Sequence, residues 1–200
     1  MPRFAGCISF PHPEENAMNV DPQIRTERDE LLAFVAEQIQ ALRNAASGLS
    51  ESQARETPTR SALSIGGLLK HAVYVFDTAQ HRLDHPDGRL SPEDYERLLP
   101  AFEASFALTE DESLDGMLAE FDRKAAGYLA TLAGLDPDAE INEPAAPWFG
   151  RPEPTPVRTR FYLLHQIEEL ARHAGHADIV REQLDGKTAY DLFPDAAQAG

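Results

Sequence analysis

Apolar residues recur at three- and four-residue steps along four long stretches of the chain, which is the period of an α-helix with one buried face. The first helix is predicted to begin with Asp21 as its N-cap and Pro22 in its first turn, and the last to end at Gly186. Four long helices with one long crossover predict an all-α four-helix bundle. The predicted helices span residues 21–46, 111–133 and 161–185, and the second helix is predicted to start near Ser61 or Ser64 and to reach residue 84.

The segments between these helices carry weaker signals. Ser91-Pro92-Glu93-Asp94 is an N-cap pattern that predicts a short helix ending near Leu99. Residues 136–156 hold six prolines and the only tryptophan, Trp148, and show no alternation of apolar and polar residues. This pattern predicts a long loop with little strand potential, and loops of this length are more often functional than idle.

A glycine pair lies inside the second predicted helix. Each glycine costs about 1 kcal/mol relative to alanine in a helix interior. Gly66 and Gly67 therefore predict either a later helix start or the close approach of a neighbouring segment.

The fourth predicted helix carries a polar stripe in place of an ordinary charged face. His165, Glu169 and His173 follow one another at four-residue steps, and His176 comes three residues later. At about 100° per residue these four side chains fall within an arc of about 80°. The opposite side is apolar and includes Leu163, Leu164, Ile167, Leu170, Ala171, Ala174 and Ala177. A histidine-rich stripe of this kind indicates metal ligation.

Glu169 and His173 form a chelating pair, and His71 near the start of the second helix is the best third ligand. Three protein ligands with an open position are usual for catalytic zinc, and nitrogen and oxygen ligands also suit nickel or iron. Structural interpretations stay open beside this one. A lone histidine on an apolar face, such as His71, is more often a hydrogen-bonded core histidine than a ligand, and Glu169 with His173 is equally interpretable as an ordinary pair on one helix face.

A second set of side chains steps by four along the second helix, namely Asp77, His81 and His85. His81 and His85 lie in its last turns, where histidines complement the negative end of the helix. We interpret them as a solvated helix end, with metal binding as the lesser alternative. The chain holds no zinc-protease HExxH motif and no G-x-S-x-G nucleophile turn, and no glycine-rich phosphate loop.

Composition narrows the class of protein. The chain has 200 residues and a formal net charge of −16, which argues against nucleic acid and anionic membranes as partners. One cysteine excludes an internal disulfide and fits a reducing, cytoplasmic location. We expect a flexible tail over residues 1–20, with Met18 as an alternative start, one domain over residues 21–188, and a C-terminal tail over residues 189–200.

The motifs resemble those of a known family. The run from Glu168 to Glu182, EELARHAGHADIVRE, with Leu-Asp-Gly186 after it, resembles the fourth-helix motif of the DinB-like superfamily. The similarity is closest to the actinobacterial branch of mycothiol-dependent transferases, related to mycothiol-dependent maleylpyruvate isomerase. Further segments resemble that branch over roughly residues 24–186, namely Gly67-Leu-Leu-Lys-His71, Glu27-Arg-Asp-Glu-Leu-Leu32 and Gly48-Leu-Ser-Glu-Ser-Gln53.

The resemblance implies an up-down-down-up bundle with a divalent metal at one mouth. Its second-helix histidine and its Glu-x-x-x-His pair correspond to His71, Glu169 and His173. It also implies that a low-molecular-weight thiol binds the metal and is transferred to a small electrophile, and that the protein forms a homodimer. The chain departs from the family at Val75-Phe76-Asp77 and at Phe161-Tyr162, where relatives often carry other acidic and aromatic residues.

The expected function is therefore that of a metal-dependent thiol S-transferase. A bound metal lowers the pKa of the thiol, so that thiolate is present at neutral pH. His176 is the candidate proton carrier or supporting residue, and Trp148 with its loop the candidate cover of the metal mouth. The alternatives are a metal-dependent hydrolase or isomerase on the same site, and a bundle that binds a metal or ligand without catalysis.

Overall fold

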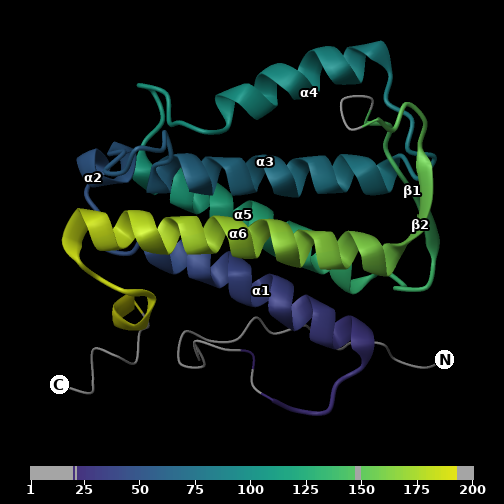
Figure 1. Ribbon diagram of the computed structural model, residues 1–200, viewed down its shortest axis with the longest axis horizontal. Helices are drawn as coiled ribbons and strands as arrows, with labels where there is room; N and C mark the ends of the chain where they lie inside the picture. The colour runs from purple at the N-terminus through teal and green to yellow at the C-terminus, as the bar shows by residue number, and fades with distance from the viewer. Residues whose placement is uncertain (1–19, 21, 147–149, 193–200) are drawn as a thin grey trace.

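Four long helices form the framework of the protein (Figure 1). The computed structural model describes residues 20, 22–146 and 150–192. The long helices are α1 (Glu27–Ala45), α3 (Ile65–Asp84), α5 (Leu114–Ala133) and α6 (Thr159–Asp185). The shorter elements are α2 (Glu51–Arg55), α4 (Pro92–Ala104), β1 (Glu140–Glu143), β2 (Thr155–Arg158) and the 3-10 helix η3 (Ala189–Leu192). The predicted all-α four-helix bundle is confirmed, with one small sheet added to it.

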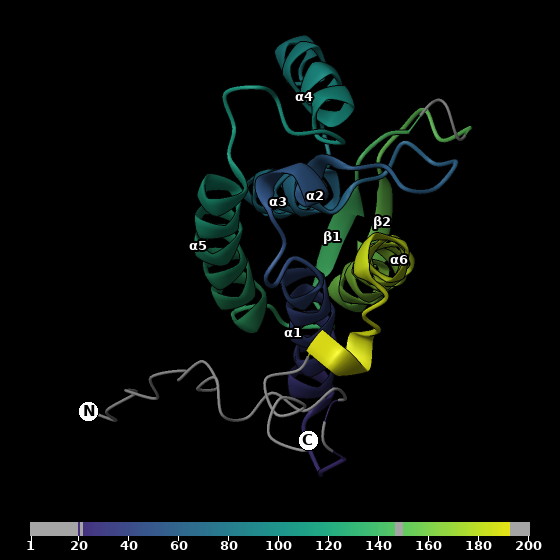
Figure 2. The same cartoon turned by 90° about the vertical axis from the view of Figure 1, so that its left-hand side faces the viewer.

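The long helices pair in parallel. α1 packs beside α6, and these two helices run in the same direction. α3 packs beside α5, and these two helices also run parallel to each other but opposite to the first pair (Figures 1 and 2). This arrangement is the expected up-down-down-up bundle. Because α3 and α5 are parallel, the chain must return along the bundle between them, and α4 lies on this return path (Figure 1).

The core is built from the apolar stripes that predicted the helices. Val35, Ile39 and Leu42 of α1 are buried as their three- and four-residue spacing requires. Leu164 is an exception, because it was expected on the apolar side of α6 and is 54% exposed. The other large buried apolar residues come from all four long helices, among them Leu68, Leu69, Phe76, Phe121, Leu132, Tyr162, Leu163 and Leu170.

Two helices, α1 and α5, start three or more residues later than predicted. α1 begins at Glu27, where the Thr26 side chain accepts a hydrogen bond from the backbone of Asp29, so the predicted start at residue 21 was too early. Asp21, the predicted cap, lies outside the described residues. α5 begins at Leu114 after the cap Ser113, three residues later than predicted. Acidic residues ahead of each true cap resemble helix-start residues, which explains both errors.

Two short strands follow α5, where a loop without strands was expected. β1 and β2 pair antiparallel, with Glu140 opposite Arg158 and Glu143 opposite Thr155. β2 is mostly exposed, and the one buried residue of β1 is the acidic Glu143, so neither strand has the buried apolar face that alternates with a polar one and by which strands are recognised in a sequence. Pro156 fits because each strand of a two-stranded sheet has a free edge. α6 begins directly after β2.

α4 is longer than expected, because it continues through Pro100 to Ala104 instead of ending near Leu99. None of its residues is buried, and in Figure 1 it stands away from the other helices. A proline costs less where the helix carries no tightly packed neighbours, since the helix can bend around it.

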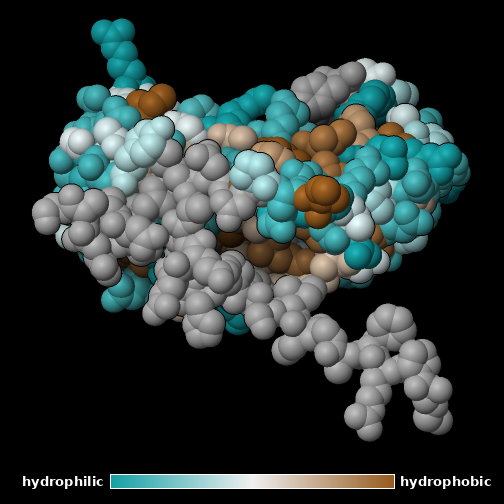
Figure 3. Space-filling view, turned by 90° about the horizontal axis from the view of Figure 1, so that it is seen from below, coloured by the Kyte–Doolittle hydropathy of each residue, from teal (hydrophilic) through white to brown (hydrophobic). Residues whose placement is uncertain are grey.

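The described residues contain no helix that is long and apolar enough to cross a membrane. The surface nevertheless carries some apolar area. Figure 3 shows brown apolar patches on the face seen from below Figure 1. Large exposed apolar side chains include Phe34 of α1, Leu99 of α4, and Phe161 and Ile179 of α6.

Candidate metal centre

His71 lies in the second turn of α3, on the side that faces α6. Ser64 caps this helix by accepting a hydrogen bond from the backbone of Gly67. The imidazole is almost fully buried, and its Nδ1 lies 2.8 Å from Oγ of Ser105. The ring of Phe106 stacks on it at 4.4 Å between centroids. His71 is thus held in a fixed orientation by the crossover segment, residues 105–113 between α4 and α5.

The glycine pair on α3 makes this packing possible. A Cβ atom on Gly67 would collide with the backbone of Phe106, and one on Gly66 would lie 2.6 Å from the side chain of Leu108. The prediction that a neighbouring segment approaches these glycines is therefore confirmed. The alternative of a later helix start is wrong, because α3 begins at Ile65, ahead of both.

Glu169 and His173 project from α6 toward His71. Nε2 of His173 donates a hydrogen bond to Oε1 of Glu169 at 3.0 Å, and Nε2 of His71 lies 3.6 Å from the same oxygen. One ligand atom from each of the three residues lies within 4.8 Å of the others. The structure thus brings together the three residues that sequence reasoning selected, from helices far apart in the chain.

Electrostatics favour a charged carboxylate between the two rings. The hydrogen bond from His173 is the main cause that holds the pKa of Glu169 well below its ordinary value. The side chains of His71, His173 and Glu169 are 4%, 12% and 27% exposed, respectively. The imidazoles are therefore shielded, and solvent reaches the group from the carboxylate side.

The donor set fits a divalent metal ion. Two imidazole nitrogens and one carboxylate oxygen converge, as in catalytic zinc sites with three protein ligands, and the same ligands suit nickel and iron. The exposed side of Glu169 leaves room for a further ligand. Among the described residues, no other group of histidine, cysteine and acidic side chains brings three such atoms together.

The two remaining histidines of the stripe differ in position. His165 is 44% exposed, and its Nδ1 lies 3.5 Å from Glu168. The ring of His176 lies 5.7 Å from that of His173, and its Nδ1 is buried without a hydrogen-bond partner in the described structure. His176 is therefore the stripe histidine that neighbours the candidate ligands, whereas His165 faces solvent.

Asp77, His81 and His85 do not form a joint group. Asp77 pairs with Lys124 of α5. The Nδ1 atoms of His81 and His85 lie 2.8 Å apart, and Nε2 of His81 lies 2.9 Å from Oδ1 of Asp94 at the start of α4. Burial is the main cause that lowers the pKa of His81. This end of α3 is thus partly covered by α4, where a fully solvated end was expected.

The proline-rich loop does not cover the candidate site with its described residues. The loop residue Asn142 contacts the segment after α3, where its side-chain amide donates to the carbonyl of Pro86. This contact lies beyond the C-terminal end of α3, whereas His71 is near its start. Trp148 lies outside the described residues. The crossover segment after α4 covers His71 instead.

Sequence reasoning missed the side chains that surround His71, which come from α3, α4 and the crossover segment. Tyr74, Phe102 and Phe106 place their rings within 6.0 Å of the His71 ring, and Ser105 contacts its Nδ1. Ser105 follows the end of α4 and belongs to no periodic pattern or motif. No signal in the sequence marks it as a neighbour of His71.

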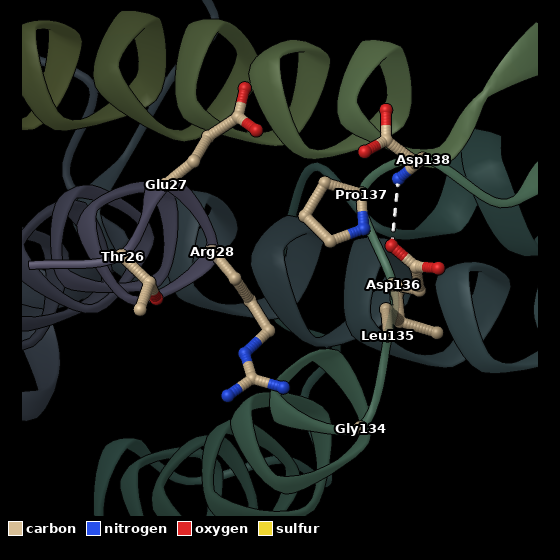
Figure 4. Close-up of a pocket in the computed structure, with 8 residues that line it drawn as sticks. All are labelled: Thr26, Glu27, Arg28, Gly134, Leu135, Asp136, Pro137 and Asp138. Atoms are coloured by element: carbon tan, nitrogen blue, oxygen red, sulfur yellow. Dashed lines mark hydrogen bonds between the residues drawn. The ribbon is translucent and has the colours of Figure 1, made fainter.

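A separate surface pocket lies away from the histidines (Figure 4). It has a volume of about 370 Å³ and lies between the start of α1 and the segment after α5. Its charged lining residues are Glu27, Arg28, Asp136 and Asp138. It includes none of the candidate metal ligands.

The comparisons with known proteins agree with this fold. Residues 30–186 match the family model described as mycothiol S-transferase. A crystal structure of a conserved protein from Enterococcus faecalis is similar in fold, with a TM-score of 0.56 and 15% sequence identity, covering 82% of this chain and 100% of that one. No curated protein matches the sequence. The predicted homodimer, cytoplasmic location and domain boundaries stay predictions. The family match covers most of the chain, and the protein therefore belongs to the mycothiol S-transferase family, a DinB-like family.

Proposed function

We propose that the protein is a metal-dependent S-transferase that joins mycothiol to a small electrophile. The convergence of His71, Glu169 and His173 carries this proposal, because it supplies a three-ligand group with an open side. The family match supports the thiol. Neither fact names the electrophile, so the proposal is limited to small molecules with a carbon atom open to attack by sulfur.

The three residues would hold one divalent ion, with zinc as the first expectation and nickel or iron as alternatives. Such an ion, when bound, lowers the pKa of a coordinated thiol, so that thiolate is available at neutral pH. Nε2 of His173 now donates its hydrogen to Glu169, so the ring proton must move from Nε2 to Nδ1 before Nε2 can bind a metal. Shielding of the imidazoles keeps water from competing on that side.

The transfer itself requires few protein groups. The thiolate sulfur forms a bond to the electrophilic carbon, and the leaving group departs with the bonding electron pair. The proton of the thiol goes to a nearby acceptor or to solvent. His176 is the proposed acceptor, because its ring lies beside His173 and its Nδ1 is not engaged by another described residue.

Metal analysis of protein purified without a histidine tag tests the site. The wild type should hold close to one equivalent of metal, and His71→Ala and His173→Ala should each lose most of it. His165→Ala is the matched control, because this histidine lies on the same helix but faces solvent. Full metal content in both ligand variants would refute the site.

Turnover assays test the reaction. Consumption of a chromogenic aryl halide should require both the metal and mycothiol, and mass spectrometry should find the thioether product. Consumption without thiol would point to the hydrolase alternative instead. Stoichiometric metal with no turnover across a panel of electrophiles would indicate a bundle that only binds its ligands.

A further inference from the structure

We infer that Ser105 is a positioning residue for the proposed metal site, because its hydroxyl fixes the tautomer of His71. The inference rests on the proposed function. Ser105 keeps the ring proton on Nδ1, so that Nε2 presents a lone pair toward Glu169 and His173. Nothing in the sequence of the crossover segment indicates this role.

The polarity of a short hydrogen-bond chain gives the tautomer. Oγ of Ser105 lies 2.6 Å from the carbonyl oxygen of Phe102 and 2.8 Å from Nδ1 of His71. A carbonyl can only accept, so the hydroxyl proton of Ser105 points to Phe102. The hydroxyl oxygen must then accept from Nδ1–H of His71. A neutral imidazole carries one such proton, which leaves Nε2 as the free acceptor.

The carboxylate of Glu169 favours the opposite tautomer. An anionic oxygen attracts an N–H group, and Nε2 of His71 lies 3.6 Å from Oε1 of Glu169. This distance is longer than a normal hydrogen bond and close to the roughly 3.4 Å expected between two ligands of one tetrahedral ion. Ser105 therefore decides between a ring that offers a lone pair to a metal and a ring that offers a proton to Glu169.

The segment that carries Ser105 is anchored to the bundle. Nη1 of Arg55 donates to the carbonyls of Leu108 and Thr109, at 3.1 and 3.0 Å. Lys70 donates to the carbonyl of Ala107 at 3.1 Å and pairs with Glu112. Ser105 itself is 2% exposed, so water does not compete for its hydroxyl. These contacts hold the hydroxyl against Nδ1 before any metal arrives.

Nuclear magnetic resonance of metal-free protein labelled with nitrogen-15 in its histidine rings tests the tautomer directly. We expect the Nδ1–H form of His71 in the wild type and the Nε2–H form in Ser105→Ala. Thr78→Val is the matched control, because the Thr78 hydroxyl, like that of Ser105, donates to a backbone carbonyl but does not contact His71. It should keep the wild-type tautomer.

Competition titration with a chromophoric zinc chelator provides the second measurement. Loss of an outer hydrogen bond to a ligating histidine typically weakens metal binding 10- to 100-fold. The zinc affinity should therefore fall by at least about 10-fold in Ser105→Ala and by less than about 3-fold in Thr78→Val. If Ser105→Ala does not fold, Ser105→Cys keeps nearly the same volume with a weaker acceptor and should show a smaller loss.

The two ways of failing are distinguishable. Wild-type protein that binds no zinc in this titration would overturn the proposed metal site. Retention of the Nδ1–H tautomer, or of wild-type zinc affinity, in Ser105→Ala would overturn the role of Ser105 and leave the metal site standing.

Discussion

Arg181 is the largest fully buried side chain in the described part of the chain, and it joins the ends of two helices. Its Nη1 donates to the carbonyls of Ala45 and Ser47, each at 2.8 Å, and its other nitrogens pair with Asp185. The last carbonyls of a helix have no partners within that helix. A side chain of α6 therefore completes the end of α1.

Replacement of this arginine should be costly. Arg181→Ala leaves buried carbonyls without a donor and Asp185 without its counterion, so the free energy of unfolding should fall by about 3–5 kcal/mol. Urea denaturation measures the change. Arg172→Ala is the control, because its pair with Glu168 is exposed and should contribute less than about 0.5 kcal/mol. A loss below about 1 kcal/mol in Arg181→Ala would contradict this account.

The buried Tyr162 predicts how the stability of the protein responds to alkali. Burial is the main cause that raises the pKa of Tyr162 to about 12. In the unfolded chain this tyrosine ionises near pH 10. Its contribution to stability is therefore fully present below that pH and is lost as the pH rises toward 12. Above pH 10, the free energy of unfolding of Tyr162→Phe should therefore fall by about 1 kcal/mol less per pH unit than that of the wild type.

Urea denaturation of both proteins at a series of pH values provides the test. Tyr190→Phe is the control, because Tyr190 is 69% exposed. Identical alkaline slopes in Tyr162→Phe and the wild type would show that Tyr162 does not cause the loss.

At the scale of elements, close packing between α3 and the crossover segment depends on Gly67. A Cβ atom there would overlap the backbone of Phe106, which carries the ring stacked on His71. Backbone cannot rotate out of the way as a long side chain can. The glycine thus sets how near this segment comes to the candidate metal centre.

Gly67→Ala should lower the free energy of unfolding by about 1–3 kcal/mol, although alanine is the better helix former, because overpacking outweighs the gain in propensity. Gly127→Ala is the matched control within α5, where a Cβ atom meets nothing within 4 Å. It should stabilise the protein by about 0.5–1 kcal/mol. Thermal or urea unfolding of both variants measures the two changes in the free energy of unfolding. Equal changes in both variants would contradict the packing argument.

The long helices were predictable because each buries one face, and burial imposes the 3.6-residue period that Val35, Ile39 and Leu42 display. The hairpin was not predictable, because its strands lack a buried alternating face and pair across a sequence gap that holds four prolines. α4 shows the same limit, since its end depends on how freely an exposed helix accommodates Pro100.

The candidate site divides in the same way. Glu169 and His173 lie one turn apart on one helix, so their spacing alone predicts that they meet. His71 required the family resemblance in addition, because its partners are on another helix. Ser105 could not be predicted, since its contact with His71 depends on the path of the crossover segment in three dimensions.

At the scale of the whole molecule, charge is strongly unbalanced. The chain has 34 acidic residues against 18 basic ones, which gives the net charge of −16. Most of the described ion pairs are at least partly exposed, and an exposed ion pair contributes little to folding stability. Repulsion among the excess carboxylates should therefore outweigh what the pairs contribute.

Added salt should stabilise the protein for this reason. The melting temperature should rise between about 10 mM and about 300 mM sodium chloride, as screening shortens the range of the repulsion. The rise should shrink near pH 4.7, where the calculated net charge is zero. A melting temperature that falls with salt at neutral pH would show that the ion pairs dominate.

The parallel pairing of the long helices also fixes an order of assembly during synthesis. α3, α4 and α5 leave the ribosome before α6. The hydrogen bond between His71 and Ser105 can therefore form before Glu169 and His173 have been synthesised. α1 meanwhile lacks its main packing partner, because that partner is α6. The growing chain thus carries one oriented histidine and an α1 helix without its main packing partner until α6 has been synthesised. The candidate metal centre closes only when α6 docks.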